Sequence, residues 1–72
     1  MNKIIDLDIE FRENIIKSEI EKFNNYLKIN NFEFDDYFDR KYLIDLKILF
    51  DNFEIKNNEI KNSLDKLLKY IN

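Results

Sequence analysis

The middle of the chain carries apolar residues at the spacing of an α-helix. Between residues 36 and 53 they recur every three or four positions, so at about 100° per residue they share one face about 140° wide. Asp35 and Asp36 stand where a helix N-cap is expected, because carboxylates accept hydrogen bonds from the first backbone N–H groups. The pattern predicts a helix over residues 36–53. Its core face comprises Phe38, Tyr42, Leu43, Leu46, Leu49, Phe50 and Phe53.

A second, narrower apolar stripe lies on the other side of this predicted helix. Strips of charged residues separate Tyr37, Ile44 and Ile48 from the core face. A helix with one apolar face needs one neighbour, whereas a helix with two needs something on its far side. Two interpretations remain open: another helix of the same bundle covers the stripe, or the stripe is an interface with a partner or a second copy.

The first part of the chain has a heptad-like seam, which predicts a helix over about residues 8–30. The seam comprises Ile9, Ile16, Ile20, Phe23 and Leu27, and Phe11, Ile15, Tyr26 and Ile29 lie off it. Residues 3–12 are ambiguous, since apolar and charged residues alternate there as they do in a strand. A short N-terminal strand or extended segment is therefore the alternative to the first turns of the helix.

The last part of the chain predicts a third helix over about residues 58–71. Asn30-Asn31 and Asn57-Asn58 separate the three helices, because asparagine tolerates the left-handed conformation where glycine is unavailable and also caps helices. Short connections favour antiparallel neighbours. The expected fold is an all-α, small three-helix bundle forming a single domain over residues 1–72. The core face of the last helix comprises Ile60, Leu64, Leu67, Leu68 and Ile71.

The residue types that are missing exclude most chemistry. The 72 residues contain no Cys and no His, so disulfides, thiolate metal sites and the commonest catalytic bases are absent. We predict neither an enzyme nor a cofactor or metal site. Stability must come from large side chains, including seven Phe and four Tyr, or from self-association. Gly, Pro and Ala are also missing, while Ile, Asn and Lys abound, which is typical of an A/T-rich genome.

The charge is mildly acidic. A formal charge of −3 argues against direct binding to nucleic acid, which needs a basic surface. The longest apolar runs are too short for a membrane span, and the start of the chain is too acidic for a signal peptide. We therefore expect a cytoplasmic protein, in the host cytoplasm if a phage encodes it.

The best candidate for a binding surface is the acidic and aromatic cluster before the central helix. Aromatic side chains are enriched in interface hot spots, and acids around them steer a basic partner. The cluster could also gather a hard cation, but it lacks the glycine turn and ligand spacing of an EF-hand. The candidate protein-binding residues are Phe34, Asp35, Asp36, Tyr37 and Asp39, with Ile44 and Ile48 as an adjoining apolar patch.

Two functions fit a chain of this kind. One is a small acidic module that binds a larger protein or nucleoprotein machine and inhibits or modulates it. Phage and mobile-element inhibitors of bacterial defence, anti-CRISPR proteins among them, have this general profile. The other is a homo-oligomeric bundle, such as an antitoxin or an assembly subunit. Its homodimer contact would combine the Tyr37, Ile44 and Ile48 stripe with the off-seam face of the first helix.

Overall fold

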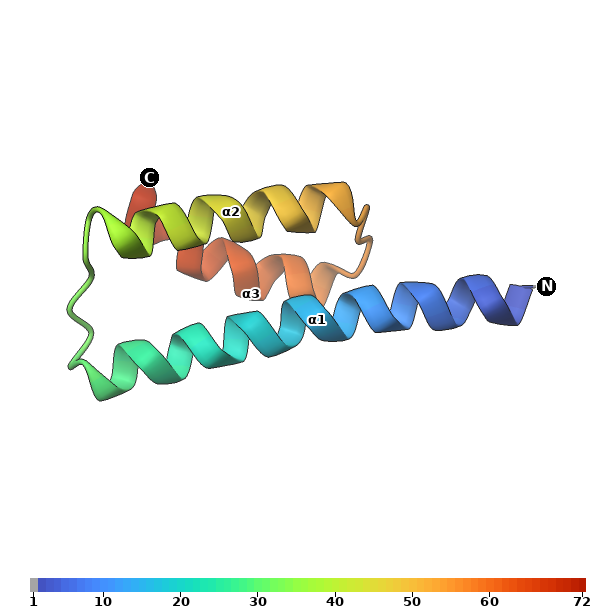
Figure 1. The fold of residues 1–72 in the computed structure, drawn as a ribbon, viewed down its shortest axis with the longest axis horizontal. Coiled ribbons are helices and arrows are strands. Elements are labelled where there is room, and N and C mark those ends of the chain that lie inside the picture. Colours follow the sequence, from blue (N-terminus) through green and yellow to red (C-terminus); the bar gives the residue numbers. More distant parts are fainter. Residues whose placement is uncertain (1) are drawn as a thin grey trace.

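The chain folds into three helices. The computed structural model describes residues 2–72, with side chains from residue 8 onward. The helices are α1 (Asn2–Ile29), α2 (Phe38–Asn52) and α3 (Asn58–Leu68), and a short 3-10 helix, η1 (Lys69–Ile71), continues α3. Successive helices run antiparallel, and each contacts the other two (Figure 1). The predicted all-α three-helix bundle is confirmed.

The N-terminal segment is helical. α1 begins at Asn2 instead of residue 8, so the alternative of a strand or extended segment over residues 3–11 is wrong. Residues 2–72 contain no strand with which such a segment could pair. A lone strand would leave its backbone N–H and C=O groups without protein partners, whereas a helix pairs most of them internally. This difference explains why the alternating pattern does not decide the structure here.

α1 is much longer than its partners. Its 28 residues span about 42 Å at 1.5 Å per residue, close to the 45 Å length of the molecule. α2 and α3 have only 15 and 11 residues, so the N-terminal part of α1 extends past the turn that joins them (Figure 1). Ile9, in the N-terminal third of α1, is exposed, contrary to its predicted place in the core seam.

The core lies where all three helices meet. Among the described side chains, α1 contributes four of the five predicted seam residues, α2 contributes the centre of its predicted face, and α3 contributes four of its five. Tyr42, Leu49, Phe53 and Ile71 pack partly buried against this centre. The buried apolar residues are Ile16, Ile20, Phe23, Leu27, Leu43, Leu46, Phe50, Ile60, Leu64, Leu67 and Leu68.

Phe38 does not belong to the core, although its position on the helical wheel predicted that it would. Its side chain is 70% exposed. Phe38 is the first residue of α2, and its ring packs edge-on against the exposed Tyr37, with ring centroids 4.8 Å apart. The periodicity gives the direction of a side chain around the helix axis, but it does not show where the neighbouring helices end.

Asparagine takes part in the end of α1 and in the start of α3, as predicted. After α1, Asn31 adopts φ 56°, and Phe32 N–H donates to the Leu27 carbonyl at 2.6 Å, which is a Schellman-type ending. Before α3, the Asn57 side chain accepts hydrogen bonds from the N–H groups of residues 59 and 60. Phe32, after Asn31, and Glu54, at the end of α2, also take the left-handed conformation, with φ 60° and 55°.

Both arginines of the chain bind carbonyls at the end of another helix. Arg12 of α1 donates from Nη1 to the Phe53 carbonyl at 3.0 Å, beside the C-terminus of α2. Arg40 of α2 donates to the Ile71 carbonyl at 3.3 Å, at the end of η1. Cations are favourable at helix C-termini, where carbonyls lack partners within the helix. The two arginines therefore tie the three helices together.

Candidate functional site

Asp35 caps α2, as predicted. Its Oδ1 accepts hydrogen bonds from the backbone N–H groups of Tyr37 and Phe38 at 2.8 and 2.7 Å. Its own N–H donates to Asp39 Oδ2 at 2.9 Å, so the two residues form a reciprocal cap. Asp36 instead pairs with Arg40 at 3.1 Å and stays exposed. The regular part of α2 begins at Phe38, two residues later than predicted.

Asp39 lies inside the bundle. Only 5% of its surface is exposed, and besides Asp35 N–H it accepts a hydrogen bond of 3.4 Å from the hydroxyl of Tyr26 on α1. Asp39 therefore connects the end of α1 to the start of α2. The side chain of Asp36 is 84% exposed and takes no part in capping, so it is the carboxylate of the candidate cluster that is free to meet a partner.

Phe34 is partly buried. Its ring stacks on that of Tyr70 in η1, with centroids 5.1 Å apart and planes at 14°. This contact holds the loop between α1 and α2 against the C-terminal end of the bundle. Phe34 therefore supports the position of the acidic cluster and presents only part of its surface to a partner.

Tyr37, Ile44 and Ile48 form an exposed stripe along the outer side of α2. Their exposed fractions are 72%, 43% and 53%. No other helix of residues 2–72 covers this stripe. Beside it, Ile44 and Ile48 border a shallow groove in which the partly buried Ile71 and the buried Leu68 of the last helix also take part. Lys47 and Asp65 flank this groove with opposite charges. We call the three residues and the groove the α2 surface.

A second groove, between α1 and α2, combines rings with carboxylates. The ring of Phe23 stacks on Tyr42 at 5.2 Å and lies 5.6 Å from Tyr26. Tyr42 donates to Glu19 Oε1 at 2.5 Å, and Tyr26 donates to Asp39. In both tyrosines, partial burial and then the hydrogen bond to the carboxylate raise the pKa above its ordinary value. We call this the α1–α2 groove.

The sequence did not single out this groove. Tyr42 was expected in the core and Tyr26 off the core seam, and Glu19 carried no prediction. Tyr26 and Glu19 are seven residues apart and therefore share one side of α1, which is the only local signal. Their partners Asp39 and Tyr42 come from α2, and helical periodicity alone does not pair residues across two helices.

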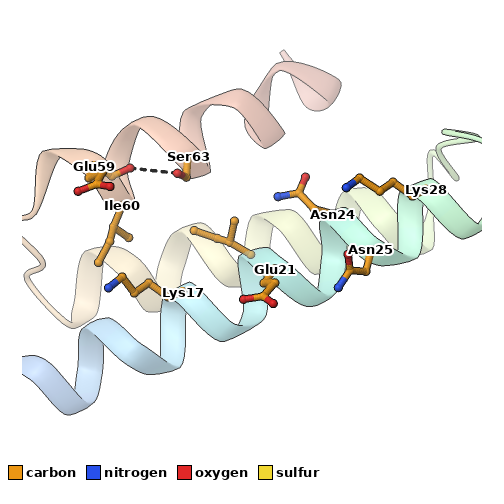
Figure 2. A pocket seen from close by; sticks show the side chains of 9 residues that line it. Lys17, Glu21, Asn24, Asn25, Lys28, Glu59, Ile60 and Ser63 are labelled. Atoms are coloured by element: carbon orange, nitrogen blue, oxygen red, sulfur yellow. Dashed lines mark hydrogen bonds between the residues drawn. The ribbon is translucent and has the colours of Figure 1, made fainter.

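A third groove lies between α1 and α3, as Figure 2 shows. Its polar side chains do not converge. Asn24 extends toward α3, whereas Asn25 and Glu21 turn away, and Lys17 and Lys28 lie far apart along α1 (Figure 2). The hydroxyl of Ser63 donates to the Glu59 carbonyl at 3.1 Å, within its own helix. This arrangement offers no set of groups aimed at one ligand.

Other kinds of site were also sought. The described residues contain no group of three or more acidic side chains placed to hold a metal ion. Across residues 2–72 we found no helix with both the length and the apolar character needed to cross a membrane. Comparison of the chain with models of protein families, with curated proteins and with solved structures found no match.

Proposed function

We propose that this chain is a non-catalytic module that binds a larger protein through the α2 surface and inhibits or modulates it. The observation that supports this function is the exposure of Ile44 and Ile48 beside a complete core. Neither residue is among the eleven buried apolar side chains of residues 8–72, so the stripe is not part of the core. Exposed apolar surface beside a groove is typical of protein–protein contact sites.

Charge around the α2 surface suits a partner with a basic region. Asp36 and the exposed Glu33 lie near the start of α2, and the whole chain carries a net charge of −3. Such acids speed the encounter with a basic protein and contribute more to the association rate than to the final affinity. An anti-defence inhibitor of the anti-CRISPR type is one function of this class, acting in the cytoplasm of a bacterial host.

The test is a nuclease-treated pull-down with the tagged protein from cells of low genomic G/C content. We expect one stoichiometric partner that the wild-type chain retains and that the double variant Ile44→Asp, Ile48→Asp loses. Ile29→Asp is the matched control, because Ile29 is 80% exposed at the C-terminal end of α1 and does not belong to the α2 surface. Retention of the partner by the double variant would refute the assignment of the α2 surface.

The alternative function is a homo-oligomer that uses the same stripe. Light scattering of the purified protein distinguishes it from the first function, since a homodimer has twice the mass of the chain without any partner. A dimer that the double variant converts to a folded monomer would favour an assembly or antitoxin-like role. We expect the wild-type protein to be monomeric.

A further inference from the structure

The α1–α2 groove gathers three aromatic rings and two carboxylates, of which Phe23 and Asp39 are buried and the other three groups reach the surface. Phe23 is buried at its base, with Tyr42 stacked on it at an interplanar angle of 13°. Tyr26 is more open, and its ring lies 5.6 Å from that of Phe23, tilted by 35°. The remaining residues of the groove are Glu19, Lys22 and Asp39.

The two tyrosine hydroxyls direct their protons toward the carboxylates. Tyr42 donates to Glu19 and Tyr26 donates to Asp39, so each hydroxyl keeps lone pairs that can accept a further hydrogen bond. The groove thus offers acceptor oxygens and aromatic faces. Both attract a cation, the oxygens through hydrogen bonds and the rings through their negative faces.

Lys22 shows that one of these oxygens is open to a cation. Its Nζ lies 3.6 Å from Glu19 Oε2, the oxygen that Tyr42 does not bind. The Lys22 side chain is 71% exposed, so this pair is loose and well solvated. Exposed pairs of this kind contribute little to stability, and an incoming cation can therefore displace Lys22.

We propose that the α1–α2 groove binds an arginine side chain of a protein partner. A guanidinium is planar, stacks on aromatic faces and bonds a carboxylate with two N–H groups, while its alkyl stem can lie along the rings. A lysine ammonium is more strongly hydrated and makes point contacts, so it fits this groove less well. The proposal shares no residue with the α2 surface and does not depend on it.

The probe is N-acetyl-arginine amide, titrated at millimolar concentrations and followed by the NMR signals of the Phe23, Tyr26 and Tyr42 rings. We expect these signals to shift, and to shift less with N-acetyl-lysine amide. The citrulline derivative has nearly the same shape without the charge and should leave them unchanged. Methylguanidinium lacks most of the stem and should bind more weakly. Equal shifts with citrulline, equal affinity for methylguanidinium, or no shifts would each overturn the proposal.

Two variants locate the site. Lys22→Gln removes the competing cation and should tighten binding of the arginine probe by up to about fivefold, the value of a surface ion pair. Glu19→Gln keeps a hydrogen-bond acceptor for Tyr42 but removes the charge, and should weaken binding by at least about fivefold. Lys17 lines the α1–α3 groove, so Lys17→Gln is the matched control and should leave the affinity for the arginine probe unchanged. An unchanged affinity in Glu19→Gln, with its helix content intact, would refute the site.

Discussion

At the scale of single residues, the acidic cluster has two structural tasks besides any contact with a partner. Asp35 caps α2, and Asp39 links Asp35 to Tyr26, whereas Asp36 makes only an exposed ion pair. The sequence predicted an N-cap at this place, but it could not show which carboxylate turns inward. That choice depends on the position of Tyr26 in α1, which lies thirteen residues before Asp39.

Neighbouring alanine variants separate these tasks. Asp35→Ala should lower the free energy of unfolding by about 1 kcal/mol, because two N–H groups at the start of α2 lose their acceptor. Asp36→Ala should lower it by about 0.5 kcal/mol or less, since it removes one exposed pair. Urea denaturation of both variants measures the difference. An equal effect of the two would mean that Asp35 is not the cap.

The raised pKa of the Tyr42 hydroxyl should make the stability of the folded protein fall at alkaline pH. Its pKa is raised in the folded protein, chiefly by partial burial and by its hydrogen bond to Glu19. The unfolded chain loses the hydroxyl proton of Tyr42 at about pH 10, whereas the folded chain retains it. The free energy of unfolding should therefore be unaffected below that pH and fall as the pH rises above it. Tyr42→Phe should make the fall smaller, measured by urea denaturation at several alkaline pH values. An identical fall in Tyr42→Phe would contradict the assignment.

At the scale of helices, the apolar spacing predicted the number and type of the elements and most of their buried faces. It failed at their ends. The first helix starts six residues early, at Asn2 instead of residue 8, and Phe38 and Ile9 are exposed although the pattern placed both in the core. A helical wheel describes one helix in isolation, whereas burial at its ends depends on the lengths of the other two.

The end of α2 stores strain that glycine would relieve. Glu54 has φ 55°, a conformation that costs a residue with a Cβ atom about 1 kcal/mol. Glu54→Gly should raise the free energy of unfolding by roughly 0.5 kcal/mol, since the added freedom of glycine in the unfolded chain offsets part of the gain. Lys66→Gly, at an exposed position within α3, should lower it by up to about 1 kcal/mol. Thermal unfolding of both variants checks the opposite signs, and a loss of stability in Glu54→Gly would contradict this account.

At the scale of the whole molecule, the sequence left open whether the Tyr37, Ile44 and Ile48 stripe is core or interface. The structure places it outside a core that is already closed, because Leu43, Leu46 and Phe50 on the opposite side of α2 meet α1 and α3. Two apolar faces on one helix can be told apart only when the positions of the other helices are known. The candidate site was therefore partly predictable, and its groove with α3 was not.

Because the core closes within one chain, the stability of the protein should not depend on its own concentration. A protein that folds as a monomer has a thermal midpoint independent of its concentration, whereas an obligate dimer becomes more stable as concentration rises. We expect no such rise for the wild-type chain. Ile44→Asp with Ile48→Asp should change the free energy of unfolding by no more than about 1 kcal/mol, because each substitution lies at an exposed position. Leu43→Ala, which empties a fully buried position, should cost about 2–5 kcal/mol. Thermal scans at low and high protein concentration test the concentration dependence, and the shift of the midpoint in each variant reports its change in stability. A midpoint that rises with concentration in the wild type but not in the double variant would show that the α2 surface binds a second copy of this chain, and would replace the binding-module function by the homo-oligomer.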